Sequence, residues 1–396
     1  MSLKNAIGGV ALLAGTAIGA AVLALPIVTA HMGFTQATLI YLLCWFFMTM
    51  GALYLLEVNL FVGYGTNLIS MAEKTLGKSG KIFTWIIYLI LLYALTAAYL
   101  TGAGAWLQEG FHHFNTAVSP IDCALLASCV TTLILFFGTA VTDWINRFLM
   151  IGLIGAFATL LFATVGHVKL ALLFSQSIKV DLTPIPIIIT AFGSAIVIPT
   201  LTEYLHGKPR QLFYVVLTGS LIPLLLYIVW EFVIMGIIPF PGRLQQSSQL
   251  LIDLPRALKT HLQNPIITKA AIYFSIFALI TSLLGVTLSL FDFLADGLHL
   301  RKTIINRSLL ALIAFLPPLS FVIFYPQGFS FALSFAGLFV ALLLGILPAV
   351  MAWRGRYHLK KERPLQMIGG KALIIMTIIF FLCVMCIECY NQYVAY

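Results

Sequence analysis

The chain consists of long runs of apolar residues separated by short polar segments. A helix needs about 20 predominantly apolar residues to cross the hydrocarbon core of a bilayer, and eleven runs meet this requirement. The longest polar segment, 239–264, predicts a turn followed by a short surface helix. The pattern therefore predicts an all-α integral membrane protein with one domain over residues 1–396. The eleven expected spans are 5–30, 35–62, 82–107, 121–140, 145–166, 185–205, 211–238, 265–294, 305–324, 329–351 and 371–392.

Composition supports this class, and the distribution of charge predicts an orientation. Hydrophobic residues make up 61% of the chain and charged residues 9%, with a mean hydropathy of +1.05, whereas soluble domains are about one-quarter charged. The net charge of +9 does not indicate a nucleic-acid partner, because most Lys and Arg residues lie in the gaps between apolar runs. Of the 22 Lys and Arg residues, 16 fall in segments on the side of the N-terminus. Such residues mark the cytoplasmic face, so we expect a cytoplasmic N-terminus and the C-terminus on the opposite side.

Two of the runs contain weak helix formers at their centre. The run 5–30 carries Gly15, Thr16 and Gly19, and the run 185–205 carries "FGSAIVIP" around Gly193. The two runs are five spans apart, so they enter the membrane from opposite sides. This arrangement predicts an inverted repeat of five plus five spans, with repeat one at about 5–166, repeat two at about 185–351, and an additional helix at about 371–392.

Interrupted helices in a membrane offer backbone groups to a polar ligand. Freed amide groups at the start of a half-helix suit a carboxylate, and freed carbonyl groups suit an ammonium group or a cation. The two breaks together can therefore hold an amino-acid zwitterion, while aromatic residues such as Tyr93 stack on its side chain. The alternative is that the glycines only allow helices to pack closely. The candidate substrate-binding residues are Thr16, Ala17, Ile18, Gly19 and Ala20 at the first break, Phe192, Gly193 and Ser194 at the second, and Tyr93.

Carboxyl groups within the spans are candidates for carrying a coupling proton, because burial favours their neutral form. Glu57 and Asp292 are the primary candidates, and Glu231, Asp296 and Glu388 also lie within spans. The alternative is structural. Glu57 then caps or bridges helices, and the aspartates pair with Arg301 or Lys302.

Adjacent hydroxyl groups in the eighth span suggest a different coupling ion. Thr281 and Ser282 could join carbonyl groups of the first span around a sodium ion. Hydroxyl groups on a helix also bond to their own carbonyl groups one turn earlier, and that alternative stays open.

Four stretches resemble a known family. "GTAIGAAVLALP" in the first span, "LLEVNLFVGYGTNLISMAEKTLG" after the second, "VTDWINRFLM" at the fifth, and residues 282–298 are similar to patterns of the bacterial hydroxy/aromatic amino acid permeases. The match is to the tyrosine and tryptophan permease branch, within the amino acid–polyamine–organocation superfamily. One departure lies in the second break, where Ser194 and Ala195 replace a Phe–His pair.

The resemblance implies a leucine-transporter-like fold in the bacterial inner membrane, with a periplasmic C-terminus. It also implies a secondary active transporter that imports aromatic amino acids by proton symport, with tyrosine as the first expectation and tryptophan or phenylalanine next. Spans 1, 2, 6 and 7 would move as a bundle to alternate access. We expect function as a monomer, no cofactor beyond the coupling ion, no metal site and no enzyme activity, since neither HExxH nor G-x-S-x-G occurs. A sodium-coupled carrier of the same fold is the alternative, and a channel a further one.

Overall fold

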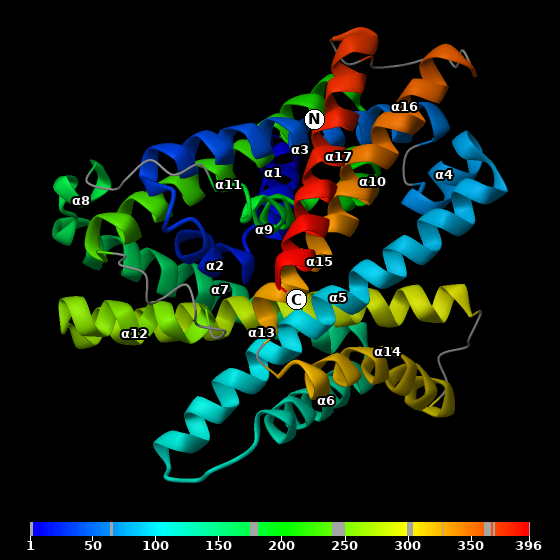
Figure 1. The fold of residues 1–396 in the computed structure, drawn as a ribbon. Helices are drawn as coiled ribbons and strands as arrows, with labels where there is room; N and C mark the ends of the chain where they lie inside the picture. The colour runs from blue at the N-terminus through cyan, green and yellow to red at the C-terminus, as the bar shows by residue number, and fades with distance from the viewer. Residues whose placement is uncertain are drawn as a thin grey trace.

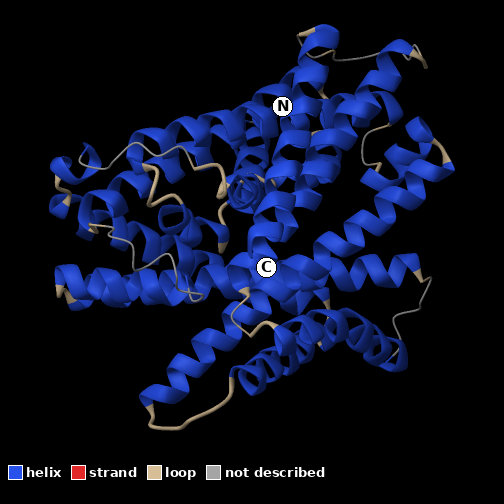
Figure 2. Cartoon of the chain, in the orientation of Figure 1, coloured by secondary structure: helices blue, strands red, loops and turns tan. Residues whose placement is uncertain are grey.

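The computed structural model describes residues 3–63, 66–174, 181–239, 250–298, 304–326, 328–359, 366 and 369–395. Every element in this described part is a helix (Figure 2). The first half contains α1 (Leu3–Ala17), α2 (Ala21–Val28), α3 (Gly33–Val62), α4 (Leu68–Leu76), α5 (Lys78–His113), α6 (Pro120–Phe136), α7 (Thr139–Thr164), η1 (Val165–His167) and α8 (Leu170–Phe174). The second half contains α9 (Ile185–Ala191), η2 (Ser194–Val197), α10 (Ile198–Tyr204), α11 (Pro209–Ile237), α12 (Leu250–Leu262), α13 (Pro265–Gly297), α14 (Ile304–Phe324), α15 (Phe329–Val340), η3 (Ala341–Ile346), α16 (Leu347–Tyr357) and α17 (Gly370–Ala395).

The helices correspond closely to the apolar runs. Within the described residues, nine helical stretches are long and apolar enough to cross a membrane, and the bent pair α1 and α2 makes a tenth span. The run 121–140 forms α6, which has only 17 residues, so an eleventh span stays a prediction. The helix expected within 239–264 is α12, whereas the turn before it lies outside the described residues.

The helices form two groups that meet at the centre of the molecule. One group contains α1, α2, α3, α9, α10 and α11, and we call it the bundle; the other contains α5, α6, α7, α13 and α14, and we call it the scaffold. Figure 1 shows α5 crossing the long helix α13 within the scaffold, with α6 and α14 beside them. The continuous stretch of α15, η3 and α16 contacts both groups, through α5 on one side and α9 and α3 on the other.

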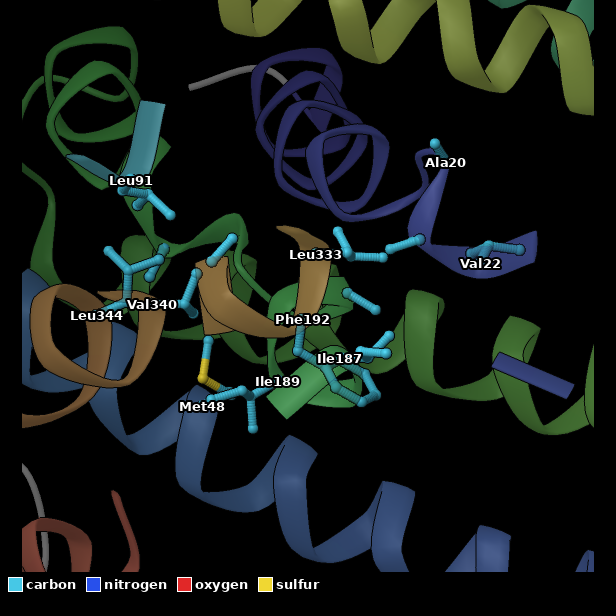
Figure 3. Packing of buried hydrophobic residues seen from close by; sticks show 14 of the residues in the cluster. Ala20, Val22, Met48, Leu91, Ile187, Ile189, Phe192, Leu333, Val340 and Leu344 are labelled. Carbon is cyan, nitrogen blue, oxygen red and sulfur yellow. The ribbon is translucent and has the colours of Figure 1, made fainter. Parts of the chain in front are cut away.

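Glycine allows the backbones to approach closely where the bundle meets the stretch of α15 and η3. A Cβ atom on Gly51 of α3 would lie 2.1 Å from the carbonyl oxygen of Leu344, and one on Gly337 of α15 would lie 2.3 Å from that of Pro186. No side chain fits at such distances, as is common at helix interfaces in membranes. Figure 3 shows the apolar packing around these contacts, including Met48 of α3, Phe192 beside α9 and Val340 of α15.

Candidate functional site

The first break separates α1 from α2, and the two helices differ in direction by 55°. α1 ends at Ala17 and α2 begins at Ala21. The amide nitrogen of Ala20 donates a hydrogen bond to Ser282 Oγ of α13 at 3.1 Å, in place of a helical carbonyl. A Cβ atom on Gly19 would lie only 2.9 Å from the same oxygen. The sequence forms a break here because Gly19 permits this approach and Ser282 satisfies an amide that the helix has released.

The second break lies between α9 and α10. α9 ends at Ala191, and after Phe192 and Gly193 the chain forms the 3₁₀ turn η2 before α10 begins. The amide of Ser194 donates to the carbonyl of Phe192 at 2.8 Å, which keeps the turn tight. Pro199 lies in the first turn of α10. It has no N–H group, so the α-helical hydrogen bonds cannot run continuously across this segment.

One side chain contacts both breaks. Tyr227 of α11 is completely buried, and its hydroxyl group lies 2.7 Å from the carbonyl oxygen of Ala17 and 2.9 Å from that of Ala191. Its ring packs against Phe192, with centroids 5.0 Å apart. The last carbonyl groups of two half-helices therefore share one donor. Sequence reasoning did not select Tyr227, because these contacts join residues 210 and 36 positions apart.

A cavity of about 610 Å³ lies next to both breaks, between the bundle and the scaffold. This volume is within the range of small-molecule sites. Seven of the residues that the sequence predicted for the substrate or the coupling ion line it. They are Thr16, Ala17, Ile18, Gly19, Gly193, Thr281 and Ser282.

The cavity wall also contains residues that the sequence analysis did not select. Tyr88 and Tyr99 of α5 add aromatic surface, and Leu91, Leu92 and Leu95 of the same helix add apolar surface. The additional polar residues of the wall are Asn146, Thr190, Thr200 and Ser289. The Asn146 Oδ1 atom is buried and has no hydrogen-bond partner among the residues that the structure describes. The cavity is therefore mainly apolar, with a few polar groups at defined positions.

The cavity lies on one side of the breaks. The residues that the first broken span contributes to the cavity lie chiefly between Ala11 and Gly19, before the break in that span. Those that the second broken span contributes lie chiefly between Gly193 and Thr200, after the break in that span. Both segments lie toward the face of the membrane that holds the N-terminus. On the opposite side, the whole of Ala21–Ile27 in α2 is buried. The described structure therefore has its cavity on the N-terminal side and a packed region on the other.

Four predicted substrate residues do not line this cavity. The amide of Ala20 donates to Ser282 Oγ, and the residue itself is buried. Phe192 and Ser194 face a void of only about 10 Å³ next to α3 and α11. Tyr93 directs its hydroxyl group to the carbonyl oxygen of Ile313 on α14 at 3.0 Å, within the scaffold.

The predicted carboxylates lie away from the cavity. Glu57 of α3 forms a buried ion pair with Arg356 of α16, in which Arg356 Nε donates to Glu57 Oε1 at 2.7 Å and Nη2 contacts Oε2. Both side chains are 0% exposed, so the pair bridges two helices. Asp292 lines a separate pocket of about 40 Å³ together with Arg307. Arg301 and Lys302, its expected partners, lie outside the described residues.

The hydroxyl pair of α13 divides its contacts. Thr281 Oγ1 donates to the carbonyl of Phe277 in its own helix at 2.8 Å. Ser282 instead accepts from the amide of Ala20. Both still line the cavity beside the first break, so their predicted role with sodium stays a prediction.

Residues 2–388 match the model of the tryptophan/tyrosine permease family. The chain belongs to this family. It is 34% identical to tyrosine-specific transport system 2 of Haemophilus influenzae, over 97% of this chain and 96% of that protein. Tyrosine-specific transport system 1 of the same organism is 33% identical, over 95% and 94% of the two chains. The tryptophan-specific transport protein of Pseudomonas aeruginosa is 30% identical, over 94% and 92%. This permease is therefore a multi-pass membrane transporter and not an enzyme.

Solved structures confirm the fold. MhsT in complex with L-phenylalanine superimposes with a TM-score of 0.64 at 15% identity, covering 96% of this chain and 98% of that chain. The manganese transporter of Eremococcus coleocola gives a TM-score of 0.60 at 14% identity, covering 96% and 84%. Both have the leucine-transporter fold, which confirms the predicted fold class for this permease.

Proposed function

We propose that this permease imports aromatic amino acids, tyrosine first, by proton symport with alternating access through the cavity beside the two breaks. The observation that carries the proposal is that Tyr227 joins both breaks, and that a cavity of about 610 Å³ is lined by residues of those breaks. Relatives at 34% and 33% identity over nearly the whole chain are named tyrosine-specific, which supports the choice of substrate.

The main-chain groups around the first break provide the chemistry for a zwitterion. Ile18 and Gly19 line the cavity between the end of α1 and the start of α2. The amide end of α2 carries positive potential and suits the substrate carboxylate, whereas the carbonyl end of α1 suits the ammonium group. Backbone groups alone can therefore bind both charges, and no charged side chain is needed in an apolar site.

The ring end of the substrate would face the aromatic and polar part of the wall. Asn146 lies one turn before Met150 on α7, and the Met150 methyl group lies 3.8 Å from where a Cβ of Gly15 would be. Gly15 lies one turn before Gly19. Because the first and fifth spans cross the membrane in the same direction, the two turns add, and Asn146 is about two helical turns, or about 11 Å along the helix axis, from the break. This is comparable to the length of a tyrosine or tryptophan molecule. The unpartnered Asn146 Oδ1 can accept from a phenol hydroxyl or an indole N–H, which phenylalanine lacks.

The arrangement of the two groups suits alternating access. The bundle and the scaffold meet across the cavity, so a change in their angle would close the N-terminal side and open the packed side around α2. With the N-terminus in the cytoplasm of a bacterial inner membrane, the described state is inward-facing. Function as a monomer is part of this proposal.

Uptake of labelled tyrosine into proteoliposomes tests the proposal. With an inward-directed pH gradient and no sodium present, the purified protein should accumulate tyrosine above the external concentration, and collapsing the gradient should abolish accumulation. Sodium symport is the second candidate, and it is favoured by the position of Thr281 and Ser282 beside the first break. Strict dependence on a sodium gradient would reject proton symport, and transport driven by the pH gradient alone would reject the sodium alternative.

A further inference from the structure

Glu231 is a buried carboxyl group in the outer half of α11. Its side chain is 0% exposed. Among the residues that the structure describes, its hydrogen-bond partners are two hydroxyl groups. Thr29 Oγ1 lies 2.5 Å from Glu231 Oε1, and Tyr41 Oη of α3 donates to Oε2 at 2.7 Å. A charge within a membrane protein is costly unless it is paired, so this environment favours a carboxyl group that can be neutral.

The hydrogen atoms around Glu231 point to a protonated state. Thr29 Oγ1 also lies 2.6 Å from the carbonyl oxygen of Leu25, one turn earlier in α2. A threonine hydroxyl has only one hydrogen to donate, and a carbonyl oxygen can only accept. If Thr29 donates to Leu25, the short contact between Thr29 and Glu231 requires a hydrogen from the carboxyl group. The neutral form of Glu231 therefore satisfies all three contacts, whereas the ionised form leaves two acceptors competing for one hydrogen.

Glu231 connects directly to the elements that form the breaks. Tyr227, which bonds to the carbonyl groups at both breaks, lies one turn before Glu231 on the same helix. Thr29 follows the last residue of α2, so its contact with Glu231 joins α11 to the half-helix that begins at the first break. Tyr41 joins the same carboxyl group to α3. A change in the charge of Glu231 thus acts on α2, α3 and α11, which belong to the bundle.

The other ionisable groups around this position do not compensate a charge on Glu231. The phenol of Tyr41 donates to it, whereas the phenol of Tyr227 is directed to the carbonyl groups at the breaks. His31, which follows Thr29 by two residues, and Lys169, before α8, are exposed. On α12, which packs against α2, Arg256 pairs with Glu109, and the buried Asp253 is acidic. Glu57 pairs with Arg356 at the opposite end of α3.

We propose that Glu231 is the residue that binds and releases the coupling proton, an inference that rests on the proposed proton symport. In the described state the carboxyl group holds the proton. The carboxyl group takes up this proton from water when the packed region around α2 is open. Its release toward the N-terminal side leaves a carboxylate, which then draws the single hydrogen of Thr29 away from Leu25. That exchange alters the end of α2 and thereby couples proton binding to the geometry of the first break.

Substitution of Glu231 by glutamine separates proton coupling from substrate exchange. The amide has the shape of a neutral carboxyl group, with one donor and one acceptor side, but it does not titrate. The Glu231→Gln protein should exchange labelled for unlabelled tyrosine in counterflow, where no net proton movement is needed. It should lose accumulation of tyrosine driven by a pH gradient, and tyrosine should no longer cause proton uptake, measured with a pH-sensitive dye inside the vesicles.

Glu388→Gln is the matched control. Glu388 is also 0% exposed within a span and is bonded to Ser334 and Gln392, each at 2.5 Å, but it lies on α17 outside the two proposed repeats. This variant should keep accumulation driven by the pH gradient. If Glu231→Gln also accumulates tyrosine as the unmodified protein does, Glu231 is not the coupling residue. If the unmodified protein itself shows no proton-driven accumulation, the proposed proton symport fails and this inference fails with it.

A second variant decides the matter if Glu231→Gln does not fold. Glu231→Asp keeps a titrating carboxyl group but moves it away from Thr29 and Tyr41. It should retain proton-driven accumulation with a displaced pH profile of uptake. A pH profile identical to that of the unmodified protein would overturn the proposal.

Discussion

The hydroxyl group of Tyr227 is the contact on which the geometry of both breaks depends, and Tyr227→Phe removes it alone. The ring packing against Phe192 is retained, because the phenyl ring of the variant occupies the same place. What is lost is the donor at 2.7 Å from Ala17 O and 2.9 Å from Ala191 O. These carbonyl groups end the half-helices α1 and α9, so no amide of the following turn replaces the missing donor.

The size of the effect follows from hydrogen-bond accounting. One hydroxyl hydrogen serves the two acceptors, so at most one full bond is lost, and leaving a buried acceptor unpaired costs about 1–3 kcal/mol. If that cost falls on the arrangement of the breaks that binds substrate, it corresponds to roughly a 5- to 150-fold loss of apparent affinity. We therefore predict that Tyr227→Phe raises the KM for tyrosine in counterflow by this order, with insertion into the membrane unchanged.

Tyr93→Phe provides the matched comparison. Tyr93 also donates to a backbone carbonyl, that of Ile313, but at a position outside the cavity. The same chemical change should lower the melting temperature of the purified protein and leave the KM for tyrosine unaltered. An unchanged KM in Tyr227→Phe, or an equal rise in both variants, would refute the assignment of the breaks to substrate binding.

Three further changes test other parts of the structure. Gly19→Val should block uptake, because its Cβ atom would lie 2.9 Å from Ser282 Oγ, and normal tyrosine uptake by that variant would reject the site assignment. Removing the opposing side chain should relieve this clash. The double variant Gly19→Ala with Ser282→Gly should therefore transport better than Gly19→Ala alone. Asn146→Leu should reduce tyrosine and tryptophan uptake more than phenylalanine uptake in competition assays. An equal reduction of all three would exclude a role for Asn146 in recognising the polar group on the aromatic ring of the substrate. Arg356→Met should destabilise the protein by about 3–5 kcal/mol in thermal unfolding because it leaves a buried carboxylate unpaired, and a second substitution, Glu57→Met, should restore much of the loss.

The broken helices could be predicted from the sequence because their signal is local. Gly19 and Gly193 stand in the middle of apolar runs where ordinary helix formers are expected, and both lie at breaks in the structure. That the two breaks are five spans apart could be predicted by counting the apolar runs. The shortness of α6 was not visible, because the apolar run 121–140 continues beyond Phe136, where the helix ends.

The contacts between distant helices could not be predicted in the same way. The partner of Glu57 is Arg356, 299 positions away, and a sequence does not show which helix a buried carboxylate faces. Tyr227 is a single polar residue in an apolar span and carries no pattern of its own. Asn146 lies within the motif "VTDWINRFLM", but the motif does not show that its side chain lines the cavity. Phe192 and Ser194 were expected at the substrate site because they flank Gly193, but the 3₁₀ turn directs them to the other side of the break, toward α3.

Counterflow tests most directly the central claim that the cavity beside the two breaks binds aromatic amino acids. Proteoliposomes containing the purified protein would be loaded with unlabelled tyrosine, tryptophan, phenylalanine or leucine, and entry of labelled tyrosine would be followed without any ion gradient. We predict rapid entry when the vesicles contain tyrosine or tryptophan, slower entry with phenylalanine, and no stimulation with leucine. Absence of stimulation by every aromatic amino acid would contradict the account.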